Sequence, residues 1–153
     1  SWKAKQYGSE ARFIELAGQV NGAMPRHVAG LVAEALNSVE RSVKGSRVLC
    51  VGVAYKPDID DVRESPALDI MELLHKRGAE VTWYDPHVTS LHGFESMPQL
   101  ASWDLASLKK FDAAVIITPH RTVDHTLLLK TGKPVVDTRN ALKGQRSEHL
   151  FKL

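Results

Sequence analysis

Several common sequence signatures are absent from this chain of 153 residues, and each absence excludes a class of protein. Cys50 is the single cysteine, so an internal disulfide and a zinc site built from cysteines are both excluded, as suits a reducing compartment. No run approaches the roughly 18 to 20 apolar residues that cross a bilayer, and the first dozen residues lack the apolar stretch of a signal peptide. We therefore expect a soluble, cytoplasmic protein with no membrane partner.

An excess of charge of one sign is also absent. The 20 basic and 18 acidic residues give a net charge of +2 and are interspersed along the chain. A nucleic-acid-binding domain usually gathers its cations on one face, so we expect no nucleic-acid partner. The apolar content of 43% is sufficient for one sizeable core.

The chain opens with a long helical pattern over residues 9 to 43, where apolar residues recur at spacings of three and four. Pro25 predicts a kink or break within this helix, and Gly45 predicts a stop after it. Some thirty residues would span roughly 45 to 50 Å, more than the roughly 25 to 35 Å expected for the rest of the chain. The helix must therefore overhang, and its apolar residues there need a partner outside this chain.

After the long helix the pattern changes to short apolar strands that alternate with helices. Strands are expected at residues 47–53, 79–84, 111–118 and 133–139, and helices at 65–78, 104–110 and 122–130. This alternation predicts an α/β fold with a doubly wound, mostly parallel, Rossmann-like sheet preceded by the long helix. We divide the chain into the helix, residues 1–44, and the α/β domain, residues 45–153.

The loop after the first strand, residues 54–65, is the best candidate for a binding site. Ligands of open parallel sheets bind beyond the carboxyl ends of the strands, and this loop exceeds the usual length of about 2 to 6 residues. Lys56 and Arg63 are suited to phosphate oxygens, and the amino terminus of the next helix also favours an anion. The equally supported alternative is that both cations pair at the surface with the aspartates of the loop, which are Asp58, Asp60 and Asp61.

The glycine-rich fingerprint of dinucleotide-binding folds is missing from this loop. The fingerprint G-x-G-x-x-G needs three glycines at fixed spacing after the strand, and only Gly52 is present. Side chains are therefore expected to hold a phosphate at least as much as the backbone does.

No metal site is predicted. His120, Asp124 and His125 could be drawn as ligands, but two histidines five residues apart do not share one helical face. The three loop aspartates lack the glycine and glutamate that follow in a calcium loop.

Residues 51–68, VGVAYKPDIDDVRESPAL, resemble the signature of the carboxy-terminal, UDP-binding domain of the UDP-glucose/GDP-mannose dehydrogenase family. That signature has an aromatic-lysine pair after the first strand, then an acidic turn and R-E-S-P. Residues 11–25 resemble the end of the family's central dimerisation helix, and residues 135–144 its last strand with the following arginine. The similarity covers nearly the whole chain and inclines toward the UDP-N-acetylhexosamine type.

The resemblance implies that this chain is a piece of an NAD-dependent nucleotide-sugar 6-dehydrogenase of polysaccharide biosynthesis, and a homodimer through its long helix. Such enzymes oxidise the C6 alcohol of a UDP-sugar to a carboxylate in two hydride transfers, through an aldehyde and a cysteine thioester. The family's NAD-binding domain and catalytic cysteine precede this region. The chain alone is therefore expected to be inactive, with no catalytic residue, because Cys50 lies in a buried strand.

Position by position, the resemblance implies that Tyr55, Lys56 and Arg139 bind the nucleotide-sugar and that Arg63 reaches across the cleft to NAD. Asn140 is the reserve for Arg139, because the register of that segment could shift by one residue.

Other polar residues and one rival function stay open. Arg12 and Asn21 fall near the sugar site of the family, but a surface or capping role is as well supported. His120 belongs to a T-x-H segment that recurs in the family without a metal. The rival function is a noncatalytic, dimerising nucleotide-binding module. A receiver-like signalling domain fits less well, since Val53, Ala54 and Tyr55 stand where it needs paired acids.

Overall fold

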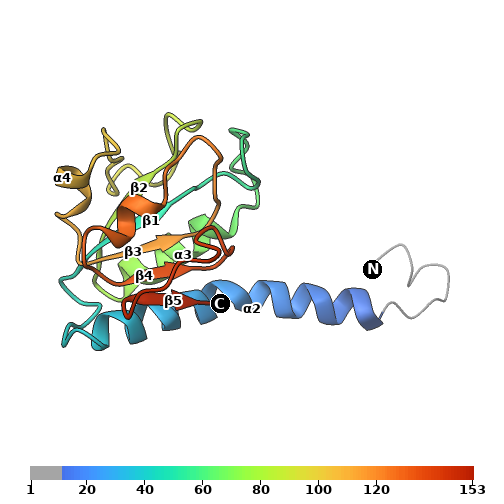
Figure 1. Ribbon diagram of the computed structural model, residues 1–153. Helices are drawn as coiled ribbons and strands as arrows, with labels where there is room; N and C mark the ends of the chain where they lie inside the picture. Colours follow the sequence, from blue (N-terminus) through green and yellow to red (C-terminus); the bar gives the residue numbers. More distant parts are fainter. Residues whose placement is uncertain (1–11) are drawn as a thin grey trace.

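The computed structural model describes residues 12–153, which form a long helix followed by a five-stranded sheet with helices on both faces (Figure 1). The strands are all parallel and lie in the order β2-β1-β3-β4-β5. They are β1 (Arg47–Val51), β2 (Glu80–Tyr84), β3 (Ala113–Ile116), β4 (Val135–Asp137) and β5 (Leu150–Lys152). The helices are α2 (Arg12–Asn37), α3 (Pro66–Lys76), α4 (Leu105–Leu108) and α5 (Thr126–Leu129). The predicted Rossmann-like α/β fold is confirmed.

Side chains that alternate along the strands divide the core into two layers. Cys50 and Val115 belong to the layer beneath α2 and α3, whereas Leu49 and Ile116 belong to the layer beneath α4 and α5. Strands β1 and β3 are thus buried on both faces, which explains their continuous apolar runs. Because β2 and β3 lie on opposite sides of β1, the chain changes direction between β1 and β3. Such a switch point is where open parallel sheets bind ligands.

Helix α2 runs without interruption through Pro25, so of the predicted kink or break the break is absent, and the kink stays a prediction. Val28, Val32 and other residues of its second half are buried against the domain. Its first half projects beyond the sheet (Figure 1), and the residues Phe13 and Val20 there are 89% and 51% exposed. The overhang that the sequence predicts is therefore present, although residues 9 to 11 of the predicted helix lie outside the described part.

The end of α2 comes earlier than residue 43, and Gly45 does not form it. Glu40 has φ 58°, the left-handed conformation that usually selects glycine. Its N–H donates to the carbonyl of Asn37, and the N–H of Arg41 donates to the carbonyl of Leu36. This pair of bonds is a Schellman motif, which satisfies the last carbonyls of the helix.

The short elements differ most from expectation. Helices α4 and α5 are single turns, shorter than the predicted 104–110 and 122–130. Strand β5 is not predicted at all, because its residues are only partly buried and show no strand pattern. Among the described residues, no helix combines the length and apolar character needed to span a membrane.

Candidate functional site

The structure brings together, at the carboxyl ends of the strands, the residues that were predicted to bind the substrate. Tyr55, Lys56 and Arg139 line one cavity of about 570 Å³, and Asn21 faces the same cavity from α2. Its remaining walls come from α2, the start of α3 with the end of the loop before it, and the segments after β3, β4 and β5. These residues are Gly22, Met24, Pro25, Val28, Glu64, Pro66, Asp69, Ile70, Ile117, Thr138 and Leu153. The volume lies within the range of small-molecule sites, roughly 300 to 1,000 Å³.

Arg139 is fixed at the cavity through its own backbone and side chain. Its N–H donates to Asp137, the last residue of β4, and its Nε donates to the carbonyl oxygen of Ile117 at 3.2 Å. Asn140, the reserve position, does not line the cavity, and its side chain accepts from Lys152. The register therefore favours Arg139, whose contact with substrate stays a prediction.

Lys56 and Arg63 behave differently, although they share one loop. Lys56 faces the cavity, forms no ion pair among the described residues, and places its Nζ 5.6 Å from the centre of the Tyr55 ring. Arg63 lies outside the cavity and pairs with Asp61 through two bonds, Nε to Oδ1 at 2.9 Å and Nη2 to Oδ2 at 2.8 Å. These bonds lower the pKa of Asp61 to about 2. Surface pairing, the alternative weighed for both cations, is thus found for Arg63 only.

Backbone donors that could hold a phosphate after β1 are already occupied. Oδ2 of Asp85, the residue after β2, accepts from the N–H groups of Val53 and Ala54 at 2.8 and 3.0 Å. In a dinucleotide-binding fold the corresponding donors face the pyrophosphate. A phosphate at this edge must therefore be held by side chains, as the missing fingerprint predicts.

The amino terminus of α3 is occupied as well, so the expectation that its free N–H groups favour an anion is wrong. Pro66, its first residue, has no N–H. The N–H of Ala67 donates to the hydroxyl of Ser65, and the N–H of Leu68 donates to the Ser65 carbonyl. Ser65 thus satisfies the donors of the first turn itself.

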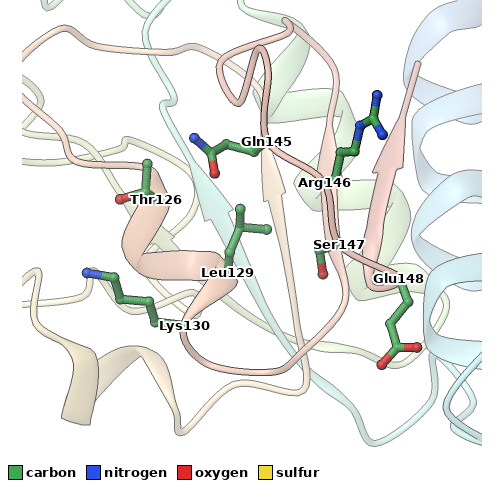
Figure 2. Close-up of a pocket in the computed structure, with 7 residues that line it drawn as sticks. All are labelled: Thr126, Leu129, Lys130, Gln145, Arg146, Ser147 and Glu148. Atoms are coloured by element: carbon green, nitrogen blue, oxygen red, sulfur yellow. The ribbon is translucent and has the colours of Figure 1, made fainter.

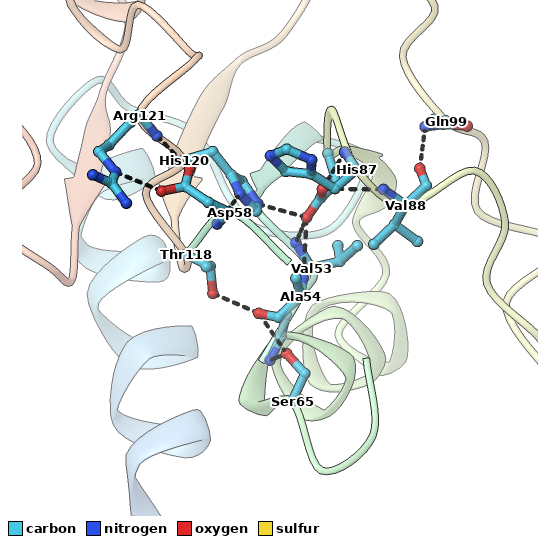
Figure 3. Close-up of polar contacts among 12 residues, drawn as sticks. Val53, Ala54, Asp58, Ser65, His87, Val88, Gln99, Thr118, His120 and Arg121 are labelled. Atoms are coloured by element: carbon cyan, nitrogen blue, oxygen red, sulfur yellow. Dashed lines mark hydrogen bonds and ion pairs between the residues drawn. The ribbon is translucent and has the colours of Figure 1, made fainter. Parts of the chain in front are cut away.

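A buried polar network lies beside the loop of residues 54–65, which joins β1 to α3 (Figure 3). His120 places its Nε2 2.8 Å from Oδ2 of Asp85, and its Nδ1 accepts from the backbone N–H of Asp58 at 3.0 Å. The side chains of Asp85 and His120 are completely buried. Burial opposes ionisation of Asp85, but hydrogen bonds from His120 and the backbone outweigh it, so the pKa of Asp85 lies below its usual value.

Three side chains of this region could approach a metal ion. Ligand atoms of Asp58, His87 and His120 lie within 4.8 Å of one another. However, both ring nitrogens of His120 already have partners, and both carboxylate oxygens of Asp58 accept from Arg121. Ligation by His120 would break one of its two bonds, and the ion would lie next to the guanidinium of Arg121, so the arrangement does not favour a metal ion.

A larger hollow, of about 750 Å³, lies between α5 and the segment before β5 (Figure 2). It is lined by Thr126, Leu129, Lys130, Gln145, Arg146, Ser147 and Glu148. Most of these side chains are exposed, and none stands at the carboxyl end of a strand, because they belong to α5 with the residue after it and to the segment before β5. We therefore place the candidate site at the switch-point cavity, not at the larger hollow.

Sequence reasoning missed Asp85 and the role of His120. Asp85 follows β2 directly and His120 lies in the segment after β3, at the edge where ligands bind, and this position was the available signal. Glu64 and Asp69, two carboxylates that line the cavity, were also missed.

Residues 49–144, more than half of the chain, match the family model described as UDP-glucose/GDP-mannose dehydrogenase family, UDP binding domain. A UDP-N-acetyl-D-mannosamine dehydrogenase of Pyrococcus horikoshii is 33% identical over 135 residues, which covers 85% of this chain and 30% of the relative. A UDP-glucose 6-dehydrogenase of Rhizobium meliloti is 30% identical over 161 aligned residues, covering 97% of this chain and 35% of the relative.

The fold agrees with these relatives. The solved structure of a UDP-D-ManNAc dehydrogenase from Pyrococcus horikoshii superposes with a TM-score of 0.78 at 27% identity, covering 97% of this chain and 35% of that one. This chain spans about a third of the length of the curated relatives it matches.

Proposed function

The chain belongs to the UDP-glucose/GDP-mannose dehydrogenase family, and we propose that its switch-point cavity binds the nucleotide-sugar substrate of an NAD-dependent dehydrogenase. The observation that carries the proposal is the meeting of Tyr55, Lys56 and Arg139 in one cavity, although Arg139 is far from the others in sequence. Two cations there offer charge-assisted bonds to a diphosphate. The Tyr55 ring offers a surface for a base or a sugar.

In the complete enzyme we infer that a UDP-sugar is oxidised at C6 to a carboxylate in two steps, with UDP-N-acetylhexosamines as the preferred substrates. NAD would accept the hydrides. This chain's part is to hold and orient the substrate, with no catalytic residue of its own. Residues 1–44 would serve assembly and residues 45–153 binding, and the enzyme would act in the cytoplasm in polysaccharide biosynthesis.

The fit of this chain to NAD is limited. Asp85 occupies the N–H groups that a dinucleotide would need after β1. Arg63 is the remaining candidate contact, because its side chain is 86% exposed and, within residues 12–153, pairs with Asp61 alone. A phosphate of NAD could replace Asp61 at little cost, since exposed ion pairs contribute little.

Calorimetric titration of the chain with UDP, uridine and inorganic phosphate tests the nucleotide site. We expect one UDP per chain, with much weaker binding of uridine and of phosphate, because neither engages both the cations and the ring. Equal binding of phosphate and UDP, or no UDP binding at millimolar concentration, would contradict the proposal.

The noncatalytic dimerising module remains the second candidate. The observation that favours it is that Phe13, Leu16 and Val20, on the projecting half of α2, are more than half exposed and offer an apolar surface to a second copy. NADH formation from a UDP-sugar by the chain joined to a relative's NAD-binding and catalytic region would exclude this candidate. Binding of UDP without NADH formation would support it.

A further inference from the structure

The loop that carries Lys56 has a buried anchor that nucleotide binding does not use. At the tip of the loop, Asp58 adopts φ 63° and donates its backbone N–H to Nδ1 of His120 at 3.0 Å. The His120 residue is only 1% exposed, whereas Lys56 and Arg121 are on the surface. A buried ring therefore holds an exposed loop (Figure 3).

The donor and acceptor roles in this anchor follow from chemistry. A backbone N–H can only donate, so Nδ1 of His120 is an acceptor without a proton. The neutral ring then carries its proton on Nε2 and donates it to Oδ2 of Asp85. Each ring nitrogen thus has one partner of the correct kind.

Asp85 fixes the loop at two places. It accepts directly from the N–H groups of Val53 and Ala54, which precede Tyr55 and Lys56. It also orients His120, which holds the tip at Asp58, two residues beyond Lys56. Lys56 therefore lies between two points that one buried carboxylate controls.

Arg121 supplies a second restraint on the tip. Its backbone N–H donates to Oδ1 of Asp58 at 2.9 Å, and its Nε donates to Oδ2. The side-chain part of this pairing is weak, because the Arg121 side chain is 90% exposed and exposed ion pairs contribute little to stability. A further bond, from the Tyr55 N–H to the Asp61 carbonyl, closes the loop without attaching it to the sheet.

We propose that His120 is a positioning residue, which acts through Asp58 to hold Lys56 at the cavity before the nucleotide binds. The proposal rests on the proposed function of Lys56 as a substrate contact. If only a fraction of the chains holds Lys56 in place, the apparent dissociation constant for UDP equals the intrinsic constant divided by that fraction. Losing the anchor therefore weakens UDP binding.

Two amide substitutions of His120 separate positioning from a general structural role. In His120→Asn the side-chain oxygen falls near the place of Nδ1, where it can still accept from Asp58, but the contact with Asp85 is lost. In His120→Gln the amide reaches the place of Nε2 and can donate to Asp85, but the loop loses its acceptor. If His120 served only to pair the buried Asp85, the Gln variant would be the better substitute.

Calorimetry with UDP and amide hydrogen exchange on the loop give the readouts. We expect His120→Asn to bind UDP within about twofold of the original chain, and His120→Gln to bind about two- to tenfold more weakly, the worth of one neutral hydrogen bond. Exchange of the Asp58 amide should accelerate in the Gln variant only. In a chain that already carries Lys56→Ala, His120→Gln should weaken UDP binding no further, because the contact through which His120 acts is already lost.

The opposite order of the two variants, or additive effects with Lys56→Ala, would overturn the proposal. If the original chain does not bind UDP, the proposed function fails, and the Asp58 exchange rates alone then decide whether His120 anchors the loop. Should neither variant fold, nitrogen chemical shifts of the original His120 remain decisive. A protonated Nδ1 is incompatible with the anchor.

Discussion

At the scale of the residue, Lys56 and Arg63 make a matched pair of cations on one loop. Lys56 lines the cavity, whereas Arg63 lies outside it and pairs with Asp61. We expect Lys56→Ala to weaken UDP binding to this chain about tenfold to a hundredfold, the worth of a charge-assisted bond to phosphate. Arg63→Ala should leave UDP binding within about twofold. Calorimetry on both variants checks this, and equal losses would remove the distinction between the two residues.

Cys50 provides a second test at this scale. Burial raises the pKa of its thiol to about 12, so the thiol stays protonated at every ordinary pH in the folded protein. Because the thiolate is the reactive form, we expect no modification by iodoacetamide at pH 8 in the native chain. Complete modification should follow in denaturant, which serves as the control. Rapid modification of the native chain would show that the strand opens or that the thiol is accessible.

At the scale of the element, the turn after β1 depends on Gly52. This residue has φ 81°, and a Cβ built there would lie 1.9 Å from the carbonyl oxygen of Thr118. Backbone strain and overlap with the backbone of the segment after β3 would both follow, so we expect Gly52→Ala to lower the free energy of unfolding by about 3 kcal/mol or more. Gly93→Ala is the matched control, because Gly93 has φ 84° with open space around it. It should cost only about 1 kcal/mol, from strain alone.

Urea denaturation of the two glycine variants measures these costs. Similar losses for Gly52→Ala and Gly93→Ala would mean that the close approach of Thr118 to Gly52 contributes nothing.

The elements also show where sequence patterns suffice and where they fail. Strands β1 and β3 were predictable because their apolar runs satisfy burial on both faces. The end of α2 was not predictable, because Glu40 adopts the left-handed conformation there and glycine is the residue that usually indicates this conformation in a sequence. Strand β5 gave no pattern, since its position depends on pairing with β4 and not on its own burial.

The residues around the candidate site also include some that the sequence could predict and some that it could not. Lys56 and Arg63 could be predicted because a long loop with cations follows β1 at the ligand-binding edge. Asp85 and His120 could not be assigned as partners, because they lie 35 residues apart and meet only when the ends of β2 and β3 are brought together. Their contact is a property of the sheet order, which local patterns do not contain.

At the scale of the whole molecule, the projecting half of α2 carries an apolar stripe. Phe13, Leu16 and Val20 recur at helical spacing and are more than half exposed. We propose that a second copy of the chain covers this stripe, and expect sedimentation equilibrium to show a dimer. Replacing Phe13 and Val20 by aspartate should give a monomer, whereas Gln19→Asp adds charge without removing apolar surface and should not. A monomer at high concentration for the original chain would contradict this prediction.

The most direct test of the account is the position of UDP in a crystal of this chain grown with the nucleotide. We predict that the diphosphate lies in the cavity between α2 and the β1–α3 loop, within hydrogen-bond distance of Lys56 and Arg139. We also predict that the N–H groups of Val53 and Ala54 stay bonded to Asp85. UDP bound in the hollow beside α5, or at the β1 turn in place of Asp85, would contradict the account.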